Sequence, residues 1–99
     1  MIEQGKCGEQ RQKDIDKLWL DGVLNQDSNV QFGLGGAGTF SDGKLTTSAH
    51  NQYVYTVFSQ LVKYGAPCEI LTEAMPHVGT DNLKTVVTNI AEDINKLGG

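Results

Sequence analysis

The sequence predicts one mainly α-helical unit, in which three to four helices surround a long glycine-rich loop that leaves room for short strand pieces. The first observation behind this is that apolar residues recur at helical spacing in three separate stretches of the chain. The second is that five of the twelve glycines lie between Gly33 and Gly43, where no such period is present. The third is the length, because 99 residues can bury one modest core but not two. Residues 1–99 are therefore treated as a single unit.

The N-terminal part combines a short extended stub with a helix. The stub, residues 2–5, is too brief to form an independent strand. A helix is predicted over residues 9–20, ended by the Asp-Gly pair at 21–22. Its apolar stripe, spaced i, i+3, i+4, consists of Ile15, Leu18 and Trp19. Trp19 shares this stripe with Ile15 and is expected in the core.

Residues 25–48 are expected to form a long loop, because they are rich in glycine, serine, asparagine, aspartate and threonine. A loop of this length in a small domain is either functional or disordered. Isolated apolar side chains can anchor it or form short strand pieces: Val30, Phe32, Phe40 and Leu45.

A second helix follows the loop and ends before the Gly65-Ala66-Pro67 segment. Its apolar positions, spaced i, i+3, i+4, i+7, i+8, are Val54, Val57, Phe58, Leu61 and Val62. His50 opens this helix and is expected to face solvent.

Two further helices complete the prediction. A short one begins at Pro67, carries Ile70, Leu71 and Ala74, and ends before Pro76. The last begins at Thr80, which is expected to be its N-cap, and ends at the Gly98-Gly99 pair. Its apolar positions are Leu83, Val86, Val87, Ile90, Ile94 and Leu97.

Charge and cysteine usage exclude several classes of protein. Eight Lys and Arg against twelve Asp and Glu give a net charge of −4, which argues against binding a nucleic-acid backbone. No apolar run approaches the roughly 18 residues that span a bilayer, and no signal peptide follows Met1. Cys7 and Cys68 lack CxxC spacing, which favours reduced thiols over a disulfide or a zinc site. We expect a cytoplasmic protein without a metal ion and without nucleic-acid or membrane partners.

The glycine loop contains two near-matches to nucleotide-binding motifs. Residues 33–38 fit GxGxxG, but neither a convincing strand before them nor a helix after them is predicted. Residues 38–44 fit GxxxxGK, but Leu45 stands where a P-loop needs a hydroxyl for Mg²⁺. What remains is a backbone that can approach an anion or a flat ring closely, with Thr39, Ser41 and Lys44 as further donors. The alternative, which the sequence leaves equally open, is a flexible surface loop in which Asp42 and Lys44 only shape a turn.

Several segments together resemble the middle of a family of bacterial and archaeal FAD-dependent dehydrogenases. The longest is the GGAGTFSDGKLTT string at residues 35–47. The others, in matching order and spacing, are residues 2–6, 29–34, 65–67, 76–81 and 97–99. The resemblance implies that this chain is a partial FAD-binding domain of an α/β fold. In that family the first strand and its GxGxxG turn precede the first matched residue, and several hundred residues follow the last.

The resemblance also implies roles for individual residues. Glu3 looks like the acid that accepts hydrogen bonds from the adenosine ribose, and Arg11 like an arginine near the cofactor. The loop that passes beside the flavin in the family matches Gly35, Gly36, Ala37, Gly38, Thr39, Phe40, Ser41, Asp42, Gly43 and Lys44. His77 is either a substrate or flavin contact or a capping or packing residue.

No self-contained catalytic set of side chains is present in the sequence, so any redox chemistry would belong to the flavin. The leading hypothesis is a fragment of an FAD-dependent oxidoreductase, inactive in isolation, whose partner is the remainder of the flavoprotein or a self-associating copy. The alternative is a free-standing, non-enzymatic helical interaction module whose apolar faces dock on a partner. P-loop hydrolysis would require ATP binding that is lost in Lys44→Ala, and we expect no such binding.

Overall fold

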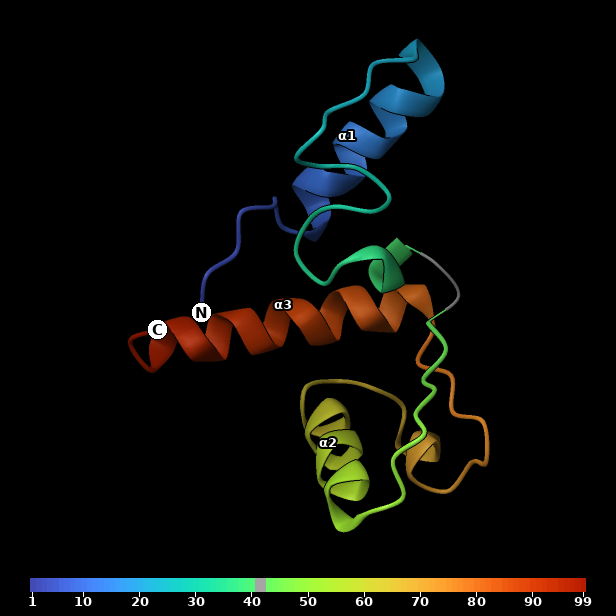
Figure 1. Cartoon of the computed structure of the whole chain (residues 1–99). Coiled ribbons are helices and arrows are strands. Elements are labelled where there is room, and N and C mark those ends of the chain that lie inside the picture. Colours follow the sequence, from blue (N-terminus) through green and yellow to red (C-terminus); the bar gives the residue numbers. More distant parts are fainter. Residues whose placement is uncertain (41–42) are drawn as a thin grey trace.

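A computed structural model describes residues 1–40 and 43–99 and confirms the mainly helical class (Figure 1). The elements follow in the order α1 (Gly8–Asp21), η1 (Ala37–Phe40), α2 (Gln52–Lys63), η2 (Cys68–Leu71) and α3 (Thr80–Lys96), where η denotes a 3-10 turn. Within the described ranges the extended pairing is limited to one antiparallel bridge, between Lys44 and His77. The predicted loop residues Ser41 and Asp42 lie outside the described residues.

Helix α1 ends where the sequence predicted. Gly22 adopts the left-handed conformation, with φ of +69°, and its N–H donates to the Leu18 carbonyl at 3.0 Å. An L side chain is strained in this conformation, so the Asp-Gly pair stops the helix for a steric reason.

Helix α2 is capped at both ends. The Asn51 side chain accepts a hydrogen bond from the Tyr53 N–H at 3.0 Å, which satisfies one of the free donors of the first turn. At the other end Gly65, with φ of +115°, donates to Val62, and Ala66 donates to Leu61 at 2.9 Å. This is a Schellman motif. His50 precedes the cap and is exposed, as expected.

The expected N-cap of α3 was wrong by one residue. Gly79 occupies that position, with φ of +82°, and its carbonyl accepts from the Leu83 N–H at 2.9 Å. Thr80 is instead the first helical residue. The positive φ explains why a glycine stands at this position, and its backbone lies against Gly43, where an added Cβ would stand 2.8 Å from the Gly79 nitrogen.

The short helix after Pro67 is a single 3-10 turn and stops before Ala74.

One hydrophobic core lies between α2, η2 and α3. Its buried members are Ala66, Ile70, Val78 and Val86. Partly buried side chains surround them: Leu45, Phe58, Leu61, Val62, Tyr64, Leu83 and Ile90. These residues and their helices form what we call the C-terminal lobe.

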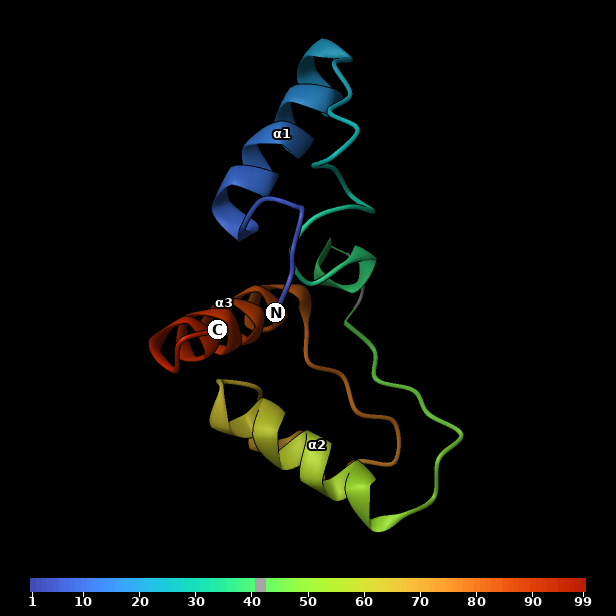
Figure 2. The same ribbon diagram turned by 60° about the vertical axis from the view of Figure 1, so that its left-hand side comes forward.

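The N-terminal segment, helix α1 and the loop after it together cover residues 2–34 and form a second body that we call the N-terminal lobe. Figures 1 and 2 show it standing away from α2, with η1 between α1 and α3. The molecule is accordingly extended, with a radius of gyration of 14.7 Å, where about 13 Å is usual for a domain of this size.

The prediction that Trp19 belongs to the core was wrong, because its side chain is 73% exposed. The buried residues of α1 are Arg11 and Ile15, on the turns that the loop covers. The apolar stripe continues beyond them to Trp19, where nothing described covers the helix.

Candidate functional site

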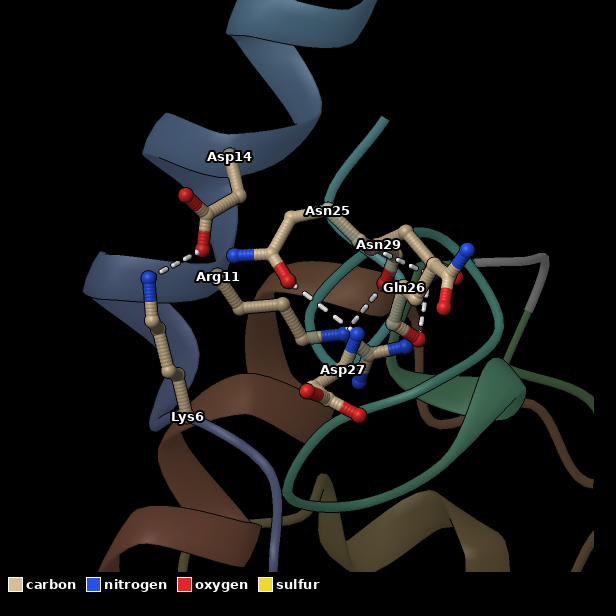
Figure 3. Close-up of polar contacts among 7 residues, drawn as sticks. All are labelled: Lys6, Arg11, Asp14, Asn25, Gln26, Asp27 and Asn29. Atoms are coloured by element: carbon tan, nitrogen blue, oxygen red, sulfur yellow. Dashed lines mark hydrogen bonds and ion pairs between the residues drawn. The ribbon is translucent and has the colours of Figure 1, made fainter. Parts of the chain in front are cut away.

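Arg11 is the residue around which the N-terminal lobe is built. Its side chain is fully buried and donates three hydrogen bonds to backbone carbonyls of the following loop. Nε reaches Asn29 at 2.7 Å, Nη2 reaches Val30 at 2.8 Å and Nη1 reaches Leu34 at 3.2 Å. Figure 3 shows the guanidinium extending from α1 toward this loop. Arg11 therefore fixes the loop against the helix, and whether it also approaches a cofactor stays a prediction.

The side chain of Asn29 stabilises the same loop through hydrogen bonds to the loop's own backbone. Its side-chain nitrogen donates to the Asn25 carbonyl at 2.8 Å, and its side-chain oxygen accepts from the N–H groups of Gln31 and Phe32. Such side chain to backbone bonds stabilise tight turns. The sequence reasoning did not single out Asn29, although the abundance of asparagine and aspartate in this stretch indicated a turn.

A surface ion pair joins the stub to α1. The Lys6 ammonium lies 2.8 Å from Asp14 Oδ2. Lys6, followed by Ser28 and Asn25, lowers the pKa of the Asp14 carboxyl below its ordinary value. Figure 3 shows Lys6 and Asp14 meeting on the side of α1 next to Arg11.

Glu3, the predicted ribose acid, lies within electrostatic range of Arg11. Burial lowers the pKa of Arg11, and the Glu3 carboxylate opposes that shift. Glu3 also accepts a hydrogen bond from the Gly5 N–H at 2.7 Å. It borders a hollow of about 470 Å³, which is lined by Glu3, Gln4, Gly5, Gln26, Asp27, Phe32 and Gly33. Glu3, which the resemblance assigns to the adenosine ribose, and Arg11, which it assigns to the neighbourhood of the cofactor, thus interact electrostatically.

Glycines make the close contacts of this region possible. A Cβ on Gly5 would stand 2.3 Å from the Cα of Gly33, and a Cβ on Gly33 would stand 2.5 Å from Arg11 Cδ. The Leu34 N–H also donates to the Lys6 carbonyl at 3.1 Å. The stub and the loop are therefore packed backbone against backbone.

The glycines of the predicted flavin loop differ in how much space surrounds the position where a side chain would begin. Gly35 has φ of +86°, and a Cβ there would stand 2.2 Å from Thr39 Oγ1, so internal packing explains this glycine. Gly36 has φ of +65° and open space where a side chain would be, which leaves its backbone approachable from outside. Thr39 is 1% exposed, and its hydroxyl has no hydrogen-bond partner within the described residues.

Phe40 joins the two lobes. The Arg11 guanidinium carbon and the Lys84 ammonium each lie 4.5 Å from the centroid of its ring. Lys84 on α3 also donates to the Gln12 side chain on α1 at 2.9 Å. Two cations over one aromatic ring, together with this hydrogen bond, tie α1 to α3.

Lys44 and His77 meet on the other side of the molecule. The Val78 N–H donates to Gly43 and the Leu45 N–H donates to Pro76, both at 3.0 Å, which places Lys44 directly opposite His77. Side chains of directly opposite residues in an antiparallel pair project on the same side. His77 is exposed, so it does not pack in the core. The pair borders a hollow of about 520 Å³ that also includes Val54, Phe58 and Met75 among its lining residues.

The predicted site residues therefore fall into two regions rather than one. Glu3, Arg11 and the turn at 35–40 lie on the side of the N-terminal lobe, while Lys44 and His77 lie beside α2. Both nucleotide-binding motifs need a strand before them and an α-helix directly after them, and the described residues show neither arrangement. Residues 33–38 lead into the 3-10 turn η1 rather than an α-helix, and residues 45–50 are not helical.

Other chemical features are few. Both cysteines are free and exposed. Across residues 1–40 and 43–99 no cluster of histidine, cysteine, aspartate and glutamate is arranged to hold a metal ion. None of the described helices has the length and apolar character needed to traverse a lipid bilayer.

Comparison with known proteins gives a match over the full length of this chain. A protein of Clostridium beijerinckii, described as uncharacterized, is 54% identical to this chain over 99 residues. The alignment covers all of this chain but only 19% of the Clostridium protein, so the chain spans about a fifth of that relative's length. No family model matches the chain.

Proposed function

We propose that this chain is part of an FAD-dependent oxidoreductase of the dehydrogenase type and contributes to its adenosine and flavin sites. The proposal rests on the family resemblance of residues 2–6, 29–47 and 76–81. It is supported by the length of the Clostridium relative, which leaves ample sequence for a pyrophosphate-binding turn and a substrate region.

The observation that carries the proposal is the packing of the resembling segments on one another. Residues 2–6 lie against residues 32–34, and residues 43–45 pair with residues 76–78. These segments are far apart in the sequence, and their contacts depend on glycines that no other residue replaces without a clash. Such close backbone packing is what a family-specific string of glycines would maintain.

Within this proposal each residue has a distinct role. Glu3 accepts hydrogen bonds from the ribose, and the open backbone at Gly36 lies beside the isoalloxazine ring. Arg11 is a positioning residue, since three of its N–H groups already bind carbonyls of the loop. Lys44 and His77 face the substrate. When bound, the flavin supplies the hydride chemistry, while the protein holds and orients the reactants.

The isolated chain is expected to bind FAD weakly and to be inactive. A dinucleotide site obtains much of its affinity from the helix N-terminus that binds the pyrophosphate, and no described helix follows a GxGxxG turn here. Partial contacts must still offset the full ordering cost of the ligand.

The proposal is tested in a chimera, in which this chain replaces the matching 99 residues of the Clostridium relative. The purified chimera is expected to carry FAD, identified by its visible absorption and by chromatography of the released cofactor. Gly36→Ala is expected to lower FAD occupancy, because it adds a methyl group to the surface proposed to face the flavin.

Gly22→Ala is the matched control. Gly22 and Gly36 have nearly equal φ, +69° and +65°, and neither has an atom within 4 Å of an added Cβ. The backbone strain is therefore the same, about 1 to 2 kcal/mol, and only the location differs. A chimera that folds without FAD contradicts the proposal, as does an equal loss of FAD in both variants.

A helical interaction module is the second candidate, favoured by the exposure of α2. This helix has no fully buried residue, and Tyr53, Tyr55 and Val57 are each more than half exposed. The module hypothesis predicts that the isolated chain associates with itself or a partner. A compact monomer in sedimentation that melts cooperatively would count against it.

A further inference from the structure

Large apolar side chains are exposed at the end of α1 and in the loop after it, and three of them, Trp19, Leu24 and Phe32, line one groove. We call this set the Trp19 patch, and its members are Trp19 (73% exposed), Leu20 (84%), Val23 (47%), Leu24 (57%) and Phe32 (59%). Single apolar residues on a surface are ordinary, but a contiguous group of large ones marks an interaction site.

The patch borders a groove between the last turn of α1 and the loop that returns along it. The groove has a volume of about 580 Å³ and is lined by Leu18, Trp19, Leu24, Gln26, Asn29, Val30, Gln31 and Phe32. Figure 1 shows this end of α1 as the part of the molecule farthest from α2.

The wall of the groove is held in place by buried polar contacts. Arg11 binds the carbonyls of Asn29 and Val30, and Asn29 exchanges hydrogen bonds with Phe32 through both its backbone and its side chain. Phe32 is therefore presented outward from a fixed turn. Preorganised aromatic side chains such as Trp19 and Phe32 are typical of the centre of a protein interface.

The accessible surface area of the chain is larger than that of a typical folded monomer of the same mass. Its accessible area is 6848 Å², whereas a folded monomer of this mass exposes about 5,500 Å². The excess of about 1,300 Å² is more than the roughly 800 Å² that one partner contributes to a standard interface. This excess is spread over the whole extended molecule and is large enough to include an interface.

We propose that the Trp19 patch is a face on which the remainder of the longer polypeptide packs. This rests on the proposed function, which makes the chain one section of a larger flavoprotein. The occupant follows from the Clostridium relative, in which the aligned 99 residues include the whole patch and about four-fifths of the chain lies outside them. An apolar surface of that remainder fits the groove, whose exposed lining is chiefly aromatic and aliphatic.

Hydroxyl-radical footprinting with mass spectrometry tests the assignment in the isolated chain and in the chimera. Corrected for intrinsic reactivity, oxidation of Trp19 and Phe32 is expected to be high in the isolated chain. In the chimera it is expected to fall to the level of Ile15, which is 4% exposed. Unchanged oxidation of the patch in the chimera overturns the proposal. Protection in the isolated chain that disappears on dilution also overturns it, because the occupant is then a second copy.

A measurement on the relative itself covers the case of a chimera that does not fold. Amide hydrogen exchange over the segment aligned with residues 18–24 is expected to be slower in the relative than in this chain. Equal exchange rates contradict the proposal.

FAD content, measured on the same samples, separates the two proposals. A chimera with FAD and an exposed patch retains the proposed function and refutes the interface. A chimera without FAD and with a protected patch supports the interface and refutes the proposed function.

Discussion

At the scale of the residue, Arg11 occupies a position that a hydrophobic side chain normally fills. It shares the inner face of α1 with Ile15 and is fully buried, yet its polar atoms bind carbonyls that would otherwise lack partners. The planar guanidinium with donors on three nitrogens matches carbonyls that diverge from one loop. The polar loop after α1 is thereby fixed without a large apolar core.

Arg11→Met is expected to lower the free energy of unfolding by about 3 kcal/mol, because it leaves buried carbonyls unpaired. Arg11→Lys is expected to recover little of this loss, since an ammonium does not span the three carbonyls. Urea unfolding followed by circular dichroism measures both variants. Lys17→Met, at an exposed position on the same helix, is the control and is expected to change stability by less than about 0.5 kcal/mol. Equal effects of Met at positions 11 and 17 would contradict the role assigned to Arg11.

At the scale of the element, α2 and α3 are joined through Tyr64. Its hydroxyl donates to the Asp93 carboxylate, and its carbonyl accepts from the Asn89 side chain at 2.7 Å. The hydrogen bond to Asp93, then burial, and then the negative charge of Asp93 raise the pKa of Tyr64 above its ordinary value. The folded state therefore retains the phenolic proton to higher pH than the unfolded chain.

The sign of the resulting pH dependence follows from linkage. A raised pKa contributes stability that is complete below the unfolded value of about 10 and is lost as the pH rises above it. We expect Tyr64→Phe to reduce the alkaline loss of stability, measured by denaturant unfolding at increasing pH. Tyr53→Phe, which changes an exposed phenol on the same helix, is expected to leave that loss unchanged. An identical alkaline profile in wild type and Tyr64→Phe would refute the linkage.

The helices were predictable because periodicity and stop signals are local. The end of α1 at the Asp-Gly pair and the end of α2 at Gly65 both follow from the steric freedom of glycine. The N-cap of α3 was missed because Gly79 has no capping side chain that would indicate it, and its conformation, with a positive φ, is set where its backbone lies beside Gly43, 36 positions away. Trp19 was misplaced for a similar reason, because periodicity indicates an apolar stripe and not how much of it is covered.

In the candidate site, too, contacts between residues far apart in the sequence could not be predicted. The glycine loop, Glu3 and Arg11 were proposed as site residues from the family resemblance, and in the structure Glu3 interacts electrostatically with Arg11. The sequence did not predict that three N–H groups of Arg11 bind backbone carbonyls, nor that Phe40 lies close to both Arg11 and Lys84. Those contacts join residues 11, 40 and 84, and no spacing rule connects positions so far apart.

At the scale of the whole molecule, two lobes meet at Phe40. Its ring lies 4.5 Å from the cationic groups of Arg11 and Lys84, and the Lys84 to Gln12 hydrogen bond lies alongside. The hydrophobic core of the C-terminal lobe does not extend into α1. The contacts that Phe40, Lys84 and Gln12 make between α1 and α3 are thus polar and cation–π contacts.

Phe40→Leu is expected to weaken this coupling by about 1 to 2 kcal/mol, because two cation–π contacts are lost. Amide exchange is expected to accelerate over residues 8–34, while α3 keeps its protection. Phe32→Leu makes the same chemical change at an exposed position and is expected to leave both lobes unaffected in the isolated chain. Uniform acceleration throughout the Phe40→Leu chain would show instead that the molecule opens as one cooperative unit.

The exposure of Trp19 also determines which optical signal reports on this protein. It is the single tryptophan of the chain, and at 73% exposure its indole is already largely hydrated in the folded state. Unfolding therefore shifts its emission little, and a fluorescence melt would record almost no transition for a chain that loses its helices. The emission of the same indole would shift to shorter wavelengths when an apolar surface covers it. Its emission wavelength therefore reports docking rather than folding.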